Sequence, residues 1–383
     1  MKNTTKCLLD VLLYGMYGKT VGEIPCEDWA SLYRLAKVHS VENIFYHAIK
    51  DMANVPAEVK DKAKRQYWSN VHQQISQDYY AGEVFLALEK VGIKYVPLKG
   101  FYLRKLYPMP ELRTSCDIDL FYDSSRTDDL SAVMREQGFT EEKGGPNHSV
   151  WMKDSVTFEP HFYLLSDNDG FHAYYENVWS RLTQVAEDRS LYAFSDEDFY
   201  IFFIVHAAKH FTHGGFGVRT VLDLHVYNQT KTLDKEYLTA EFDKLGLVKF
   251  VAAIEKLAEC WFGGAEMDED TAKVSEYVME SGTYGVSLHR VMLNNVKEKS
   301  VKGSKVSYLL ETLFLPYKQM KIRYPILTKM PILLPFYWVI RWFAVLFKRR
   351  ANITKTVNTI QTITDDKVEK YSKILEITEV PLD

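Results

Sequence analysis

Several features that define whole classes of protein are scarce in this 383-residue chain. Its four cysteines lie far apart, in none of the spacings of a zinc finger or a disulfide framework, and they are typical of reduced thiols in a cytoplasmic protein. A net charge of −4 gives no bulk electrostatic signature of nucleic-acid binding. Internal repeats and low-complexity segments are absent too, which excludes repeat architectures.

Long apolar runs are also missing. The N-terminal run Cys7–Leu13 is interrupted by Asp10, and no small-residue cleavage site follows, so we predict an amphipathic helix there and not a signal peptide. A second run, Pro331–Phe347, has 17 residues where a membrane span needs ~20, and it contains Arg341 and two prolines.

What the chain does contain is the composition of a folded protein, with 46% hydrophobic and 26% charged residues. Its length suits two or three domains of ordinary size. We predict a helical region over residues 1–92, an α/β core over 93–194 and a second helical region over 195–383.

The first region has helical hydrophobic periodicity. Residues 28–50 indicate a helix with a break near His39, and a longer helix begins after Pro56 and ends at Gly92. The expected buried stripe of this longer helix takes every fourth residue: Val59, Ala63, Tyr67, Val71, Ile75 and Tyr79.

The middle region mixes strands and helices. The pattern predicts strands over 93–98 and 117–122, helices over 101–107 and 124–137, and a hairpin of 149–152 with 156–162. From about residue 170 we expect helices again, the first of them capped by Ser195. The predicted fold class is α+β, a small mixed β-sheet flanked by N-terminal and C-terminal helical regions.

Two aspartates open the second of these strands. Because successive side chains of a strand point to opposite faces, Asp117 and Asp119 are expected to project together while Ile118 points into the core. Two carboxylates ~4 Å apart repel by about 4 kcal/mol at an effective dielectric constant of ~20. A bound cation offsets this cost, so the pair is a candidate metal site. The structural alternative is that both carboxylates cap backbone N–H groups.

Glu159, on the hairpin, is the candidate third ligand. Alternation places Glu159 and His161 on one face of their strand, and pairing of that strand beside residues 117–122 would bring Glu159 to the aspartates. Three carboxylates with open positions suit Mg²⁺. Two such ions can act on the attacking and leaving oxygens of a phosphoryl displacement.

Lys99-Gly100, at a strand-to-helix turn, is a candidate phosphate site. Glycine lets a phosphate approach the backbone, the helix that begins at Phe101 offers free N–H groups, and Lys99 adds a positive charge. The alternative is an ordinary turn without a ligand.

These residues together resemble a known family, the uncharacterised nucleotidyltransferase family within the DNA polymerase β-like superfamily. The resemblance lies in Leu98-Lys99-Gly100, Tyr107-Pro108, Arg113, Asp117-Ile118-Asp119-Leu120 and Glu159-Pro160-His161, and more loosely in His210, Arg219, Asp223 and Pro335–Arg341. It implies a polymerase β-like core, with Asp117, Asp119 and Glu159 as catalytic metal ligands. It also implies that Gly100 marks the phosphate-binding turn, to which we add Lys99 and Arg113 as nucleotide contacts.

A polar helix face follows Ser195. His206, His210 and His213 share it by their spacing of four and three residues. We expect this face to border the active-site cleft, with Lys209 or His210 in contact with phosphate or acceptor. The alternatives are a zinc site and a hydrated surface on which Arg219 and Asp223 form an ion pair.

Residues 318–350 form a basic aromatic segment, with eight positive residues and no acidic one. A membrane span is disfavoured by Arg341 and the prolines. Residues 331–347 are then either a buried helix, which is the default, or an interfacial segment attracted to anionic lipid. The second alternative makes a cytoplasmic protein peripheral to the inner face of the membrane.

The predicted function is Mg²⁺-dependent transfer of a nucleoside monophosphate from an NTP such as ATP to an unidentified acceptor, with release of pyrophosphate. In this scheme Glu159 also serves as base for the acceptor. The alternative is a non-catalytic nucleotide-binding or membrane-surface scaffolding protein on the same fold, as in envelope polysaccharide assembly. It is favoured by Phe101, which stands after Gly100 where the superfamily usually has serine.

Overall fold

The computed structural model describes residues 3–18, 24–166, 170–283, 317–348 and 365–381, with a few single positions between 285 and 315. The N-terminal region is helical, as predicted. Its helices are α1 (Asn3–Tyr17), α2 (Trp29–Val38), α3 (Glu42–Ile49) and α4 (Ala57–Val91). The expected break lies between α2 and α3, where Ser40 has a φ of 53°. Asp28 begins α2 by accepting a hydrogen bond from the Ser31 N–H group.

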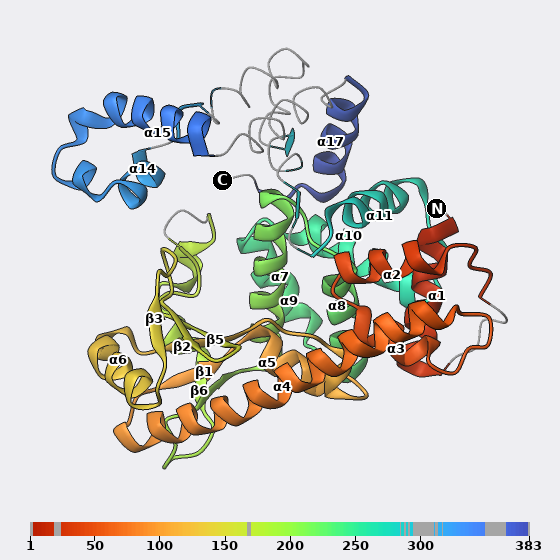
Figure 1. Cartoon of the computed structure of the whole chain (residues 1–383), viewed down its shortest axis with the longest axis horizontal. Coiled ribbons are helices and arrows are strands. Elements are labelled where there is room, and N and C mark those ends of the chain that lie inside the picture. The colour runs from red at the N-terminus through yellow and green to blue at the C-terminus, as the bar shows by residue number, and fades with distance from the viewer. Residues whose placement is uncertain are drawn as a thin grey trace.

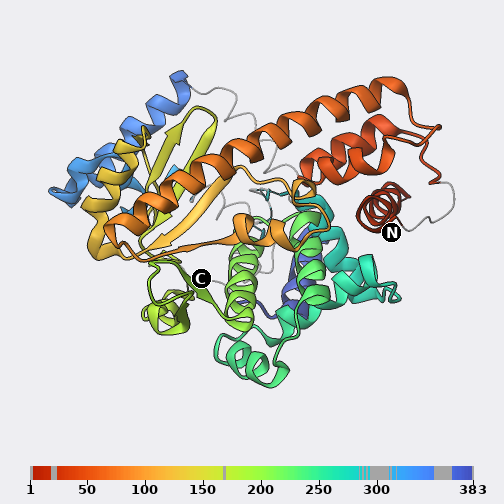
Figure 2. The ribbon, with the colours of Figure 1, turned by 90° about the horizontal axis from the view of Figure 1, so that it is seen from below.

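Helix α4 runs the length of the molecule, from the N-terminal helices to the sheet (Figure 2). It ends at Gly92, which takes the left-handed conformation with a φ of 67°. The predicted stripe was wrong in its second half, because Ile75 and Tyr79 are 63% and 64% exposed. Residues four apart rotate by about 40° per step around a helix, so the stripe winds off the buried face. The residues buried there instead are Gln77, Ala81, Val84 and Leu88.

One five-stranded mixed sheet forms the α/β part, in the order β1-β2-β5-β4-β3 (Figure 1). Its strands are β1 (Tyr95–Pro97), β2 (Asp117–Tyr122), β3 (Thr140–Glu142), β4 (Val150–Lys153) and β5 (Val156–His161). Strands β2 and β5 are parallel, and the other neighbouring pairs are antiparallel. The short helix α5 (Lys99–Leu103) follows β1, and α6 (Thr127–Glu136) follows β2. The α+β fold class is confirmed at this level.

The segment after residue 170 differs from its prediction. Instead of returning directly to helices, the chain forms a second hairpin of β6 (Leu182–Gln184) and β7 (Tyr192–Phe194). Each strand has only three residues, too few for alternation to stand out in the sequence. The Tyr95 N–H group donates to the Ser190 carbonyl oxygen, so the hairpin extends the edge of the main sheet at β1.

The C-terminal region is helical where the structure describes it. Its helices are α7 (Asp196–His213), α8 (Val218–Thr230), α9 (Lys235–Lys244), α10 (Val248–Ala258), α11 (Glu269–Ser281), α14 (Tyr317–Arg323), α15 (Leu334–Lys348) and α17 (Asp365–Thr378). Ser195 caps α7 as predicted, accepting from the Asp198 N–H group. None of the described helices combines the length and apolarity needed to cross a bilayer. Of the basic segment, Arg349 and Arg350 lie outside the described residues.

Buried residues gather in two cores. One joins the N-terminal helices to α7, α8 and α10, and the other packs the sheet against α6 and the second half of α4. The division at residues 92 and 194 stays a prediction, since the first core contains residues from all three predicted regions.

A buried ion pair ties the sheet region to the C-terminal helices. Arg113, just before β2, donates from Nε and Nη2 to the two carboxylate oxygens of Asp223 on α8, at 2.7 and 2.9 Å. The Tyr107 hydroxyl donates to the same carboxylate at 2.7 Å. The alternative in which Asp223 pairs with Arg219 is not what the structure has, because the bidentate partner of Asp223 is Arg113, 110 residues away.

We predict that Asp223→Ala lowers the free energy of unfolding by about 3–5 kcal/mol, because it leaves the Arg113 charge buried without its partner. Denaturant titration measures this loss. The control is Glu141→Ala, which removes an exposed pair with Arg135 and should cost less than about 1 kcal/mol. Equal effects of the two substitutions would contradict a structural role for the buried pair.

Candidate functional site

The carboxylates predicted as metal ligands lie at neighbouring positions on β2 and β5. The strands pair in parallel with Asp119 beside Glu159, which confirms the predicted placement of the hairpin strand. Ile118 is fully buried on the opposite face, so Asp117 and Asp119 share the other one. The three acidic side chains therefore face the same pocket.

This pocket has a volume of about 350 Å³ and lies between the sheet and helices α7 and α8. It is lined by the eight residues that the sequence analysis named as metal ligands or nucleotide contacts: Lys99, Gly100, Arg113, Asp117, Asp119, Glu159, Lys209 and His210. Segments distant in the sequence thus supply its two walls, an acidic one from β2 and β5 and a partly cationic one from α7 and α8.

Asp119 is the most constrained of the carboxylates. It is 6% exposed, and its Oδ1 atom accepts from Lys99 Nζ at 3.0 Å and from His161 Nε2 at 2.8 Å. Burial alone would raise the pKa of Asp119, but Lys99 and His161 outweigh burial and hold it below its usual range. Asp119 is therefore ionised at neutral pH.

Lys99 reaches Asp119 from an unusual backbone conformation. Its φ of 41° lies in the left-handed region, which for a residue with a side chain costs on the order of 1–3 kcal/mol. Burial would lower the pKa of Lys99, but Asp119, with Asp117 and Glu159, raises it above its ordinary value. A charged lysine thus occupies the acidic side of the pocket.

The other two carboxylates have raised pKa values. Burial and the charge of Asp119 raise the pKa of Asp117. Burial, together with Asp117 and Asp119, raises the pKa of Glu159 to about 7. Lys99 does not neutralise the whole group, so the pocket holds an excess of acidic groups that a divalent cation would relieve.

Two histidines beside Glu159 add nitrogen ligands that the sequence did not assign. Among the described residues, the group whose ligand atoms all lie within 4.8 Å of one another consists of His148, Glu159 and His161. His148 Nε2 is 3.7 Å from Glu159 Oε2. Asn147 Nδ2 donates to His161 Nδ1 at 3.2 Å, so the His161 proton is on Nε2, where it meets Asp119.

Gly100 is required by close packing. A Cβ atom there would lie 2.6 Å from Ser115 Oγ and 2.8 Å from Arg113 Nη1. Helix α5 has only five residues, so its dipole contributes little to anion binding. The nearest hydroxyl to this turn belongs to Ser115, whereas Phe101 packs edge-on against Phe85 in the sheet core.

Helix α7 contributes the opposite wall, as expected. His206 and His210 approach each other at 3.2 Å between their Nε2 atoms, while His213 Nδ1 turns back to the Lys209 carbonyl oxygen at 2.8 Å. The surrounding protein, with Lys99 and Lys209 nearby, lowers the pKa of His210 to about 4, although the residue itself is exposed to solvent. This histidine is therefore neutral at pH 7.

Comparison with known proteins gives one match. Residues 25–263 fit the family described as uncharacterised nucleotidyltransferase, and this range is more than half of the chain. The chain belongs to this family. No curated protein and no solved structure matches it.

The nucleotidyltransferase match covers the sheet and also helices α2 to α10, so it includes both walls of the pocket. The family assignment made from the motif residues is thereby confirmed, and nucleotidyl transfer is the general class of reaction that it supports. The looser resemblance at Pro335–Arg341 lies outside the matched range.

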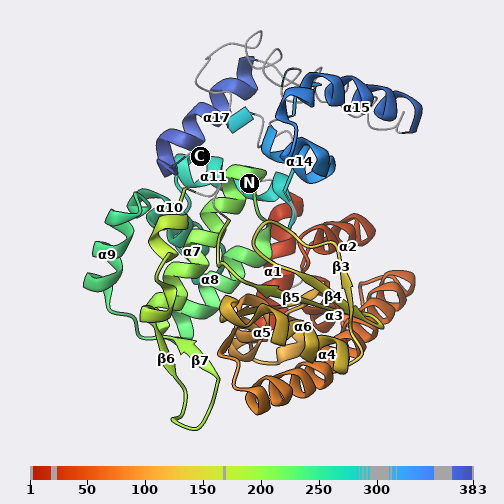
Figure 3. The same ribbon diagram turned by 90° about the vertical axis from the view of Figure 1, so that its left-hand side faces the viewer.

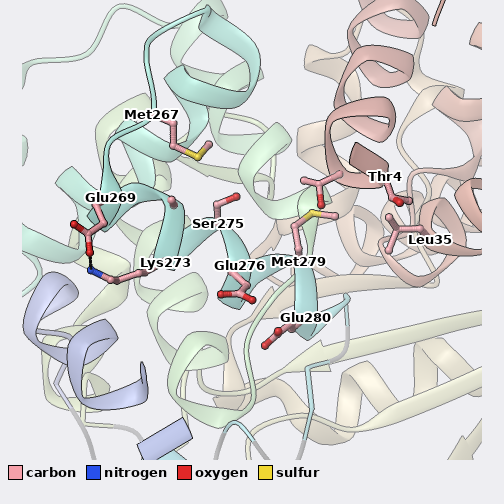
Figure 4. Close-up of a pocket in the computed structure, with 11 residues that line it drawn as sticks. Thr4, Leu35, Met267, Glu269, Lys273, Ser275, Glu276, Met279 and Glu280 are labelled. Carbon is pink, nitrogen blue, oxygen red and sulfur yellow. Dashed lines mark hydrogen bonds and ion pairs between the residues drawn. The ribbon is translucent and has the colours of Figure 1, made fainter. Parts of the chain in front are cut away.

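A second pocket, about 480 Å³ in volume, lies between α11 and the first two helices (Figure 4). It is larger than the carboxylate pocket, but its chemistry is weaker. Lys273 is paired with Glu269 at 2.7 Å, while Met267, Met279 and Leu35 make much of the wall apolar. By volume this second pocket would be the better candidate for the functional site. The charged groups that converge in the carboxylate pocket make that pocket the candidate instead.

Sequence reasoning did not name several polar pocket residues as site candidates, among them Ser115, Asn147, His148 and Arg219. His148 follows the Gly144-Gly145-Pro146 breaker, and no periodic pattern marks it as facing a site. Arg219 entered only through the looser family resemblance and as the alternative partner of Asp223. In the structure its Nη1 atom donates to the Thr114 carbonyl oxygen at 3.1 Å.

The raised pKa of Glu159 predicts how stability varies with pH in the presence of EDTA. The unfolded carboxyl ionises near pH 4.5, whereas the folded one keeps its proton until about pH 7. Folded protein therefore binds more protons in this window, and stability falls as pH rises. Glu159→Gln should remove this dependence and be the more stable protein at pH 8, by up to about 3 kcal/mol.

Thermal unfolding of both proteins at pH 5 and pH 8 measures the difference. Glu142→Gln, at an exposed position of β3, is the matched control and should follow the wild type at both pH values. A Glu159→Gln protein whose advantage is the same at pH 5 and pH 8 would refute the raised pKa.

Proposed function

We propose that this protein is a Mg²⁺-dependent nucleotidyltransferase that moves a nucleoside monophosphate from an NTP to an acceptor and releases pyrophosphate. The observation that carries the proposal is the pocket in which Asp117, Asp119 and Glu159 lie side by side and face cationic residues of other segments. We also assign the five-stranded sheet to the polymerase β-like class, on the strength of the family match and of the carboxylates on adjacent parallel strands.

The donor set fits a divalent cation. Three carboxylates offer hard oxygen ligands, and the raised pKa values of Asp117 and Glu159 reflect a negative charge that the protein only partly neutralises. A bound Mg²⁺ supplies Lewis-acid stabilisation of the phosphoryl oxygens and of the leaving pyrophosphate. Asp117, Asp119 and Glu159 would hold it, as one ion or as two.

The remaining pocket residues bind and orient the substrate. Lys99 and Lys209 bring positive charge to the side of the pocket where a triphosphate would meet the carboxylates. Lys99 pairs with Asp119 at 3.0 Å, so its ammonium group lies beside the carboxylates that would hold the ion and would be near the phosphates of a bound nucleotide. Arg113 acts mainly as a positioning residue, because its bidentate pair with Asp223 holds the two walls together.

Proton transfer from the acceptor falls to Glu159. It is the pocket carboxylate with the pKa nearest neutral pH, which suits a general base. Most of the rate enhancement comes from orientation and charge neutralisation, because phosphoryl displacement needs little covalent help.

Asp117→Asn and Asp119→Asn are each expected to reduce nucleotidyl transfer by at least about 100-fold, because each removes a charged oxygen ligand. The assay screens NTPs with cell extract for a labelled product and for released pyrophosphate. Asp128→Asn, an exposed position on α6, is the control and should keep full activity. Full transfer by either pocket variant would eliminate this mechanism.

The alternative of a non-catalytic nucleotide-binding protein rests on Phe101 after Gly100. Calorimetry of Mg²⁺–NTP binding, run beside the pyrophosphate assay, separates the two functions. Binding without pyrophosphate release under any acceptor mixture supports the alternative, and binding with release that Asp119→Asn abolishes supports the enzyme.

The histidines affect which metal binds. Imidazole is a good ligand for Zn²⁺ and a poor one for Mg²⁺. We expect His148→Ala to weaken Zn²⁺ binding by about tenfold or more while Mg²⁺ binding changes little. Calorimetric titration of each metal measures both constants. If the two affinities fall equally, His148 supports the pocket without selecting the metal.

A further inference from the structure

Exposed apolar side chains are concentrated in one part of this protein. Of the 23 large hydrophobic residues exposed among the described positions, ten lie between Leu310 and Phe343. That stretch is a small fraction of the chain, and the remaining 13 are scattered over all the other elements. Scattered exposure is ordinary, whereas a contiguous apolar patch marks a surface that contacts something.

The elements that carry this patch form a unit of their own. Helix α14, the short 3₁₀ turns Pro325–Thr328 and Pro331–Leu333, and helix α15 pack mainly on one another. In two perpendicular views, α14 and α15 lie together at the edge of the molecule (Figures 1 and 3), and Figure 1 shows them on the opposite side from the N-terminal helices. Leu327 and Met320 are fully buried inside the unit.

Helix α15 has an inner face that is well packed. The indole N–H groups of Trp338 and Trp342 donate to the carbonyl oxygens of Leu315 and Leu313, at 2.9 and 2.7 Å. Both indole rings pack edge-on against Phe314, with ring centroids 5.1 and 5.3 Å apart. The unit therefore holds α15 in one orientation.

The outer face of α15 is the apolar one. Phe336 is 62% exposed, and Val339 and Ile340, one turn further along the same face, are also exposed. Ile332, in the turn that leads into the helix, is 84% exposed. The opposite face is already occupied by Trp338 and Trp342, so the outer residues cannot turn inward without breaking those hydrogen bonds.

The charge around this surface has one sign. Residues 312–364 contain no aspartate or glutamate but nine lysines and arginines, in a chain whose net charge is −4. Within the described part of this stretch, Lys321, Arg323 and Lys329 are exposed. An apolar surface bordered by cations matches an anionic lipid headgroup layer over hydrocarbon.

We propose that the surface formed by α14, α15 and the turns between them docks on an anionic lipid bilayer, with Ile332 and Phe336 inserted at the headgroup boundary. A helix of 15 residues is about 22 Å long, shorter than the ~30 Å hydrocarbon core, so α15 lies in the interface and does not span it. This inference does not depend on the carboxylate pocket.

The test is co-flotation of the full-length protein with vesicles. Neutral vesicles of phosphatidylcholine are compared with vesicles that contain about 30% anionic phosphatidylglycerol. We expect flotation with the anionic vesicles, weakened by salt. Combined Ile332→Glu and Phe336→Glu should abolish it, and each of Lys321→Ala, Arg323→Ala and Lys329→Ala should weaken binding about fivefold.

The matched control is the pair Ile75→Glu and Tyr79→Glu, which changes two equally exposed apolar side chains on α4. It should float like the wild type. Thermal melting confirms that both double variants remain folded, since every altered side chain is exposed. Wild-type protein that stays unbound overturns the proposal, and so does normal flotation of the protein with both Ile332→Glu and Phe336→Glu. A wild-type dimer that these two changes dissociate also overturns it, because that outcome assigns the surface to a second copy.

Discussion

The pocket exists because Arg113 and Asp223 meet across the interior. Arg113 directly precedes the strand that bears the aspartates, and Asp223 lies in the middle of α8, so their bidentate contact fixes the distance between the acidic and cationic walls. Both side chains are buried, which makes the pair costly to break and insensitive to salt. Tyr107 adds a third hydrogen bond to the same carboxylate. This contact adds a directional constraint to the shared hydrophobic core that already joins the sheet region to the C-terminal helices.

Within the pocket, unequal neutralisation gives the three carboxylates different properties. Asp119 has both nearby donors, Lys99 and His161, and stays ionised. Asp117 and Glu159 are buried beside other carboxylates without a comparable donor of their own, so their pKa values rise. Lys99 is held in a left-handed conformation where it can pair with Asp119. Lys99 therefore places a positive charge directly beside the carboxylate group.

The amphipathic unit of α14 and α15 is not part of the carboxylate pocket, and its apolar side chains are exposed. It lies outside the range shared with the nucleotidyltransferase family, and its apolar residues face outward although the protein has two large cores. Indole hydrogen bonds to backbone carbonyl groups fix its inner face and leave its outer face for a partner. Chemistry and placement at a surface would then be carried by separate parts of one chain.

Local sequence signals located many of the elements. Ser195 and Gly92 mark helix ends, and the alternation around Ile118 and Phe158 marks the strands, because caps and strand alternation depend on neighbouring residues alone. The carboxylate triad followed from one further assumption, that β5 pairs beside β2. Short elements were not predicted from the sequence, as with the three-residue strands β6 and β7. The α4 stripe also failed, since its neighbours change from the N-terminal helices to the sheet along its length.

The sequence by itself determined the residue types and the absence of acidic residues from positions 312–364. It also determined the alternation along each strand, which places Asp117 and Asp119 on one face of their strand and fixes the face that Glu159 takes on its own. Only the tertiary structure decided the partners. It joined Arg113 to Asp223 instead of Arg219, brought His148 and Asn147 to the carboxylates, and turned the tryptophans of α15 inward. The reason is physical: side-chain direction along one element is a local property, whereas pairing between distant segments depends on the packing of the whole chain.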